Sequence, residues 1–317
     1  MKLSVNGITI EAEDTGGPGD PILLIMGLGG QLIHWPAGFT QGLLDAGYRV
    51  IRFDNRDAGL STHFPAKSTP NLPWIATQAW LGLRPRLPYT LSDMAADALG
   101  VMDALGVEKA HVIGLSMGAM IAQRVALAAP QRVQSLTCIM GSSGARGIMK
   151  PTSAVMRAGA GKPRGQADAE TLARYYVRFL QAISSPTLPP SREAFMEVFE
   201  RTAARHSPDA AATARQLAAI LIDGARAKQL ASISAPTLVV HGSQDPFVPP
   251  VCGEDTARRI PGARLQMIPD MAHDLAPAVH PEILRRVLAV LLPFLAEHPL
   301  GLEPQVPTLR AQPRAES

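Results

Sequence analysis

Short uninterrupted hydrophobic runs along the chain alternate with stretches in which hydrophobic residues recur with helical periodicity. Such runs are typical of strands that are buried on both faces of a sheet. The runs are residues 21–27, 48–54, 110–115, 133–140, 235–242 and 263–269. The helical periods are residues 91–105, 117–129, 252–260 and 280–296. Because strands and helices alternate, we predict an α/β fold with a mostly parallel central sheet and helices on both of its faces.

Three segments depart from this alternation. Near the start, Asn6 and Gly7 stand between two alternating segments, which predicts an antiparallel hairpin at the edge of the sheet. Residues 142–232 carry helical patterns without a convincing strand, and residues 298–317 are polar and rich in proline. The predicted domains are a core of residues 1–141 and 233–297, a helical cap of residues 142–232 inserted into it, and a loosely ordered tail of residues 298–317.

Composition and charge argue against several classes of function. The 317 residues are 46% hydrophobic, enough to bury a large core, and the formal net charge is +3. Because the basic residues are scattered along the chain, we expect no nucleic-acid partner. The chain has neither a signal-like start nor an apolar run of the roughly 20 residues that a membrane span needs, so we predict a cytoplasmic protein. Cys138 and Cys252 have no metal-binding or redox spacing, and no metal site is predicted.

A serine stands where the hydrophobic run of residues 110–115 gives way to a helical period. Gly114-Leu115-Ser116-Met117-Gly118 fits the pattern G-x-S-x-G, in which a strained turn between a strand and a helix exposes the serine hydroxyl above the sheet. Side chains at positions 114 and 118 would collide at so tight a turn, which explains the two glycines. The strand before the serine and the helix after it supply the context that this motif requires, so we predict that Ser116 is a nucleophile.

A serine hydroxyl needs a base to take its proton, and the base needs an acid to orient it. In enzymes with this elbow the acid and then the histidine follow the serine along the chain. Asp245 and His273 each follow a predicted strand, in the loops where a parallel sheet collects its active residues. Of the eight histidines, only His273 both follows the serine and the acid along the chain and lies in a loop after a predicted strand. Asp270 and Asp274 are too close to His273 in sequence to reach around its ring, so we predict Asp245 as the acid.

Hydrolysis by a serine also needs hydrogen-bond donors for the negatively charged oxygen of the tetrahedral intermediate. One expected donor is the backbone N–H of Met117, the residue after the nucleophile. The second should come from the loop after an earlier strand, where Gly27, Gly29 and Gly30 let the backbone approach the serine. We assign this second donor to the N–H of Leu28. A glycine-rich turn without a catalytic task is the alternative interpretation.

The chain resembles the α/β-hydrolase fold superfamily from the first hairpin to about residue 297. Besides the elbow and its two partner loops, residues 54–61, DNRDAGLS, are similar to the D-x-R-G-x-G-x-S turn of these enzymes, with Asp57 where glycine is usual. Three segments resemble the aclacinomycin methylesterase type of bacterial carboxylesterase. They are IMGLGGQLIHWP, RFDNRDAGLST and HVIGLSMGAMIAQ. The His-Gly that is common before the oxyanion donor is Met26-Gly27 here, so the support of that loop is expected to differ.

The resemblance implies an α/β-hydrolase fold and a serine carboxylesterase that works through an acyl-serine intermediate, without a metal or a cofactor. Its expected partner is a small-molecule ester with an apolar or aromatic part, and a homodimer is left open. Lactonase, amidase, perhydrolase and acyltransferase chemistry use the same triad and stay open. A ligand-binding receptor of the same fold is a further alternative, because a fold by itself does not decide between binding and catalysis.

A long connection at residues 63–89 contains two of the three tryptophans, Trp74 and Trp80. Connections well beyond a dozen residues are often lids or binding loops. We therefore take as a hypothesis that Trp74 and Trp80 form one rim of an apolar or aromatic substrate pocket, joined by Trp35 beside the oxyanion loop. The alternative is that these rings only pack the connection against the cap.

Overall fold

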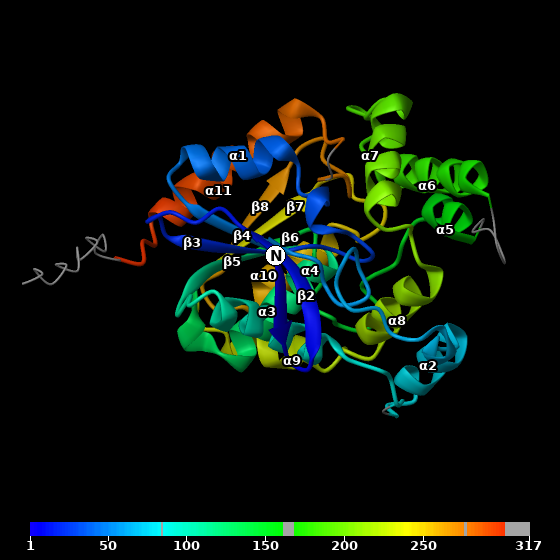
Figure 1. The fold of residues 1–317 in the computed structure, drawn as a ribbon, viewed down its shortest axis with the longest axis horizontal. Helices are drawn as coiled ribbons and strands as arrows, with labels where there is room; N and C mark the ends of the chain where they lie inside the picture. Colours follow the sequence, from blue (N-terminus) through cyan, green and yellow to red (C-terminus); the bar gives the residue numbers. More distant parts are fainter. Residues whose placement is uncertain (84, 161–167, 276–277, 302–317) are drawn as a thin grey trace, which may run out of the picture.

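A computed structural model describes residues 1–83, 85–160, 168–275 and 278–301 of the chain. Within these ranges the chain forms an eight-stranded sheet (Figure 1). Its strands are β1 (Lys2–Val5), β2 (Ile8–Asp14), β3 (Pro21–Ile25), β4 (Arg49–Phe53), β5 (Ala110–Leu115), β6 (Val133–Ile139), β7 (Thr237–Gly242) and β8 (Arg264–Ile268). Each of the six hydrophobic runs contains one of the strands β3 to β8, which confirms that these runs are strands.

The strands lie in the order β1, β2, β4, β3, β5, β6, β7, β8. β2 pairs antiparallel with both β1 and β4, and the remaining pairs are parallel. The hairpin between β1 and β2 turns at Asn6 and Gly7, whose φ angles are 49° and 75°. Two successive positive φ angles are what a two-residue hairpin turn needs. The predicted fold class, a mostly parallel sheet with an antiparallel hairpin at its edge, is therefore confirmed.

Helices cover both faces of the sheet. On one face lie α1 (Ala37–Asp45) and α11 (Pro281–Ala296), and on the other lie α3 (Leu91–Ala104), α4 (Met117–Ala128) and α10 (Val251–Arg259) (Figure 1). Thr90 caps α3 through a capping box with Asp93, which fixes where that helix begins. Among the helices of the described ranges, none has both the length and the apolar character needed to cross a bilayer.

Short helical turns connect several of these elements. They are η1 (Leu32–His34), η2 (Ala66–Ser68), η3 (Pro130–Arg132) and η4 (Leu230–Ser232). The long connection of residues 63–89 also contains α2 (Leu72–Trp80), which packs against a helix of the segment between β6 and β7.

The segment between β6 and β7 is helical wherever it has regular secondary structure in the described ranges. Its helices are α5 (Ser153–Ala160), α6 (Ala169–Ile183), α7 (Arg192–Arg205), α8 (Ala210–Leu221) and the short α9 (Arg226–Gln229). We call α5 to α8 the inserted helices. They lie to the right of the sheet in Figure 1. Of the predicted tail, residues 302–317 lie outside the described residues.

A buried ion pair joins the inserted helices to the core. Arg215 of α8 donates from Nε and Nη2 to the two carboxylate oxygens of Asp57, at 2.8 Å each, and both side chains are fully buried. The Tyr89 hydroxyl and the Phe64 N–H also donate to this carboxylate. Burial by itself raises the pKa of Asp57, but the hydrogen bonds from Arg215 and Tyr89 outweigh it and leave the pKa below its usual range. Asp57 is therefore held as a carboxylate, and α8 is fixed to the loop after β4.

Replacing Arg215 by methionine should lower the free energy of unfolding by about 3–5 kcal/mol, because it leaves the buried carboxylate without its cation. Urea denaturation at neutral pH measures this change. Arg174→Met is the matched control in the same group of helices, since Arg174 pairs with Glu170 on the surface and exposed pairs contribute little. Equal destabilisation by the two substitutions would contradict an anchoring role for the buried pair.

Candidate active site

Ser116 lies on a sharp turn between β5 and α4. Its φ and ψ are 55° and −116°, a conformation that L-residues adopt only under local constraint. A Cβ atom at Gly114 would lie 2.2 Å from the carbonyl oxygen of Gly118, and a Cβ atom at Gly118 would lie 1.9 Å from that of Ile25. Both contacts are far below a van der Waals separation, so the two glycines are required for the chain to pass at this point.

The structure brings Ser116, His273 and Asp245 together from three separate loops. Nε2 of His273 lies 2.9 Å from Oγ of Ser116, and Nδ1 of His273 lies 2.7 Å from Oδ2 of Asp245. A carboxylate only accepts hydrogen bonds, so Nδ1 carries the ring proton and Nε2 is free to accept the serine proton. All three side chains meet at the end of the sheet where the parallel strands finish.

Backbone packing holds the acid and the base in this arrangement. The N–H groups of Phe247 and Val248 donate to the other carboxylate oxygen of Asp245, Oδ1, at 2.9 and 2.8 Å. A Cβ atom at Gly242, the last residue of β7, would lie 2.3 Å from the carbonyl oxygen of Met271. This glycine thus lets the loop that carries Asp245 approach the loop that carries His273.

The two predicted oxyanion donors lie on segments that flank the serine. Met117 is the first residue of α4, where backbone N–H groups have no partner within the helix. Leu28 follows Gly27, and a Cβ atom at Gly27 would lie 3.2 Å from Cβ of Ser116. Gly27 therefore permits the turn of residues 27–30 to pass beside the nucleophile. We call this segment the 27–30 turn.

Among the described residues, no group of three or more His, Cys, Asp or Glu side chains is placed to hold a metal ion. What the site offers is a serine with a base, an acid that orients the base, and backbone N–H groups beside the serine. These are the components of nucleophilic acyl transfer.

Comparison with known proteins agrees with this arrangement. Residues 20–276 match the family model described as the alpha/beta hydrolase fold. The chain belongs to the α/β-hydrolase fold family. It is 30% identical over 302 residues to rhodomycin D methylesterase of Streptomyces peucetius, covering 89% of this chain and 94% of that protein. This likeness supports the predicted enzyme class, a carboxylic ester hydrolase.

Solved structures of other hydrolases share the fold. The enol-lactonase from Burkholderia xenovorans LB400 is 22% identical and superposes with a TM-score of 0.65, covering 93% of this chain and all of its own. A thermophilic esterase from Thermogutta terrifontis is 24% identical, with a TM-score of 0.64 and coverage of 94% of this chain and 98% of its own. At these identities the likeness establishes the shared fold.

In this α/β hydrolase, the loop of residues 54–61 supports the 27–30 turn. Asp54 accepts the N–H of Leu32, just beyond the turn, at 2.6 Å, and Asn55 donates to the carbonyl oxygen of Met26 at 2.8 Å. Arg205 of α7 donates to Asp54 as well. Sequence analysis recognised the DNRDAGLS motif but assigned these side chains no task. Their contacts to Met26 and Leu32, on either side of the 27–30 turn, are visible only in the folded chain.

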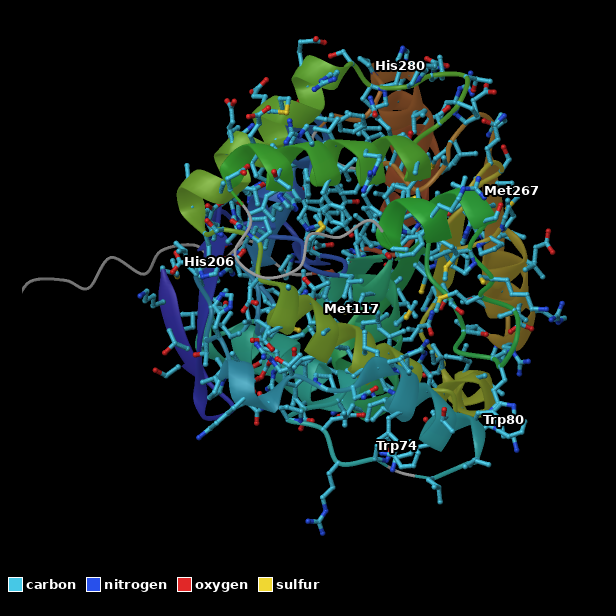
Figure 2. All side chains as sticks on the ribbon, turned by 90° about the vertical axis from the view of Figure 1, so that its right-hand side faces the viewer. Trp74, Trp80, Met117, His206, Met267 and His280 are labelled. Atoms are coloured by element: carbon cyan, nitrogen blue, oxygen red, sulfur yellow. The ribbon has the colours of Figure 1, made fainter. Side chains whose placement is uncertain are left out.

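The three tryptophans lie in different environments. Trp35 is buried and stacks on Phe39 of α1, within the core on one face of the sheet. Trp74 and Trp80, on α2, are 59% and 76% exposed. Figure 2 shows both at the lower edge of the molecule, away from Met117 near its centre. A substrate pocket formed by these three rings stays a prediction. The ring of the triad residue His273 packs against a different aromatic residue, Phe247.

Two phenylalanines connect the triad histidine to the inserted helices. Phe247 packs edge-on against the ring of His273, with ring centroids 5.1 Å apart. Phe179 of α6 packs edge-on against Phe247, at 5.8 Å. Sequence analysis missed both residues. Phe179 falls in a helical period that by itself gives no indication of a contact 68 residues further along the chain.

Two other histidines, His111 and His241, have hydrogen-bond partners outside the triad. His111 of β5 is fully buried, and its Nδ1 lies 2.7 Å from the hydroxyl of Ser135. Burial lowers the pKa of His111 to about 4, since a protonated ring there would lose its hydration. Burial also lowers the pKa of His241, whose Nε2 lies 2.8 Å from the carbonyl oxygen of Val248 beside Asp245.

The free energy of unfolding should fall as the pH is lowered from about 6.5 towards 4. The folded-state pKa of His111, about 4, lies below the ordinary value of 6.5, so the unfolded chain binds the proton more readily over this interval. The stabilisation that the neutral ring of His111 contributes is fully present above the unfolded-state pKa of 6.5 and is lost as the pH falls towards 4. His111→Asn should reduce this pH dependence without abolishing it, because His241 contributes in the same direction. Urea denaturation at several pH values measures the slope, and an identical slope in the variant would disprove the assignment.

Proposed function

We propose that this α/β hydrolase cleaves carboxylic esters through an acyl-serine intermediate. The observation that carries the proposal is the continuous hydrogen-bonded chain from Asp245 through His273 to the hydroxyl of Ser116. The strained turn presents that hydroxyl at the N-terminus of α4. The 30% identity to a methylesterase supports an ester as the substrate.

In the acylation step, Oγ of Ser116 attacks the ester carbonyl carbon while Nε2 of His273 takes the hydroxyl proton. Asp245 stabilises the positive charge that forms on the imidazole ring. The carbonyl oxygen becomes negatively charged and is bound by the N–H groups of Met117 and Leu28. When the tetrahedral intermediate breaks down, His273 returns the proton to the alkoxide, so the alcohol leaves as a neutral molecule.

Deacylation repeats these steps with water. His273 removes a proton from the water molecule as its oxygen attacks the acyl carbon of the Ser116 ester. The same two N–H groups bind the second oxyanion, and His273 then gives the proton back to Oγ of Ser116. The products are a carboxylic acid and the free enzyme. The cycle consumes one water molecule and needs no redox partner.

The substrate side of the site is proposed to be aromatic. Phe247 and Phe179 extend from the histidine towards α6, and Tyr175 of α6 stacks on Phe179 with centroids 6.4 Å apart. Apolar side chains around a few placed polar groups are typical of small-molecule sites. We propose that the inserted helices act as a cap and that Phe179 contacts the apolar or aromatic part of the ester.

Purified protein should hydrolyse a p-nitrophenyl ester series, and Ser116→Ala should lower kcat by about five to six orders of magnitude because the nucleophile is lost. Release of p-nitrophenol measures both. Ser232→Ala is the control, since this exposed serine donates to the carbonyl oxygen of Gln229 in its own helical turn and its substitution should leave kcat unchanged. Turnover that survives in Ser116→Ala would refute the proposed nucleophile.

Phe179→Ala should change the preference among acyl groups. The variant should lose about tenfold or more in kcat/KM for long or aromatic acyl groups relative to acetate, because apolar contact with the substrate is removed. The double substitution of Trp74 and Trp80 by alanine tests the alternative pocket in the same series. A shift in the tryptophan variant together with none in Phe179→Ala would reverse the proposed assignment.

A further inference from the structure

Two of the three peptide groups within the 27–30 turn are each held by a hydrogen bond. The first, between Gly27 and Leu28, carries the N–H that we assign to the oxyanion. Its carbonyl oxygen, that of Gly27, accepts from the N–H of Gly30 at 3.1 Å. Because a peptide group is planar, with C=O and N–H pointing in opposite directions, this bond directs the Leu28 N–H out of the turn.

The second peptide group, between Leu28 and Gly29, is held from outside the turn. The N–H of Gly29 donates to Oε1 of Gln216 at 2.7 Å. Nε2 of the same side chain donates to the carbonyl oxygen of Arg56 at 2.8 Å. Gln216 is fully buried, and both ends of its amide are satisfied. It connects the 27–30 turn to the loop after β4, although it belongs to α8.

The register of α8 is fixed by the residue beside Gln216. Arg215 makes the buried bidentate pair with Asp57. Asp57 has a φ of 64°, so it keeps the backbone conformation that favours glycine while adding a carboxylate. The pair holds α8 against the loop of residues 54–61, and this places the Gln216 amide against Gly29.

We propose that Gln216 is a positioning residue for the oxyanion donor, and that it makes catalysis depend on the docking of α8. This inference rests on the proposed function, because the 27–30 turn is assigned its task there. Gln216 touches the turn and not the reacting atoms. It acts by keeping the peptide group between Leu28 and Gly29 in one orientation. This preserves the turn closed by the Gly30-to-Gly27 hydrogen bond, so that the Leu28 N–H stays directed at the developing oxyanion.

The expected consequence of losing this contact is specific to the transition state. Without an acceptor, the peptide group between Leu28 and Gly29 can rotate, since Gly29, with a φ of 65°, has no side chain to oppose rotation. This rotation disturbs the hydrogen bond from the Gly30 N–H to the Gly27 carbonyl oxygen that closes the turn, and the Leu28 N–H then loses its fixed direction. An oxyanion donor bonds more strongly to the tetrahedral intermediate than to the ester, so kcat should fall while KM changes little.

Gln216→Met tests this directly, because methionine keeps the length of the side chain and removes both hydrogen bonds. We expect kcat to fall by about tenfold to a hundredfold, the range for a misplaced but still present catalytic group, with KM within twofold. The affinity for a trifluoromethyl ketone, which forms a tetrahedral oxyanion on Ser116, should fall by the same factor as kcat. A variant with kcat within twofold of the wild type would overturn the proposal.

Thr213→Val is the matched control. Thr213 lies one turn earlier on α8 and faces the same glycine, because a Cβ atom at Gly29 would lie 3.6 Å from its hydroxyl oxygen. That hydroxyl donates to the carbonyl oxygen of Asp209 within its own helix. The substitution is isosteric and should leave kcat unchanged. An equal loss of kcat in both variants would mean that α8 acts by packing alone, and would overturn the role of Gln216.

Hydrogen exchange separates this inference from the proposed function. Amide exchange in residues 26–31 should be faster in Gln216→Met than in the wild type and unchanged in Ser116→Ala. Equal exchange in Gln216→Met and the wild type would overturn the inference whatever the enzyme hydrolyses. If Gln216→Met does not fold, Gln216→Asn takes its place. Its amide is one methylene too short to reach Gly29, so the same losses are expected.

Discussion

The close approach of backbone segments around Ser116 is the constraint on which the site depends. The start of α4 lies against the end of β3, so closely that any side chain at Gly118 would overlap the carbonyl oxygen of Ile25. The same approach places the 27–30 turn, which continues from β3, next to the serine. A similar contact at Gly242 brings the loops of Asp245 and His273 together. Glycine at these positions is a geometrical requirement of the fold, and the relative placement of nucleophile, base and backbone donors follows from it.

The inserted helices are joined to this centre by directional polar contacts. The pair between Arg215 and Asp57 is buried, and it needs correct geometry because a buried charge without its partner is strongly destabilising. Gln216 likewise has both ends of its amide occupied. Apolar packing alone would tolerate small shifts of α8, whereas these hydrogen bonds fix one register. The pair at Asp57 and the contact that supports the 27–30 turn are therefore linked through neighbouring residues of α8.

A second connection runs through aromatic rings. His273, Phe247 and Phe179 pack edge to face in sequence, from the triad to α6. Edge-to-face packing suits rings whose faces carry partial negative charge and whose edges carry partial positive charge. The inserted helices thus reach both sides of the serine, with α8 at the 27–30 turn and α6 at the histidine. A change in how these helices dock would affect both sides together.

The sequence by itself determined the class of fold, because strands buried on both faces and amphipathic helices leave patterns that depend only on local neighbours. It also indicated Ser116, Asp245 and His273, since the elbow has a fixed spacing and its partners a fixed order. The contacts of Asp57 and Gly29 with α8 could not be predicted, because these partners lie 158 and 187 residues away and their pairing depends on how an inserted helix docks. The same holds for the exposure of Trp74 and Trp80. Local pattern decides which elements form, whereas packing between distant elements decides which polar groups meet.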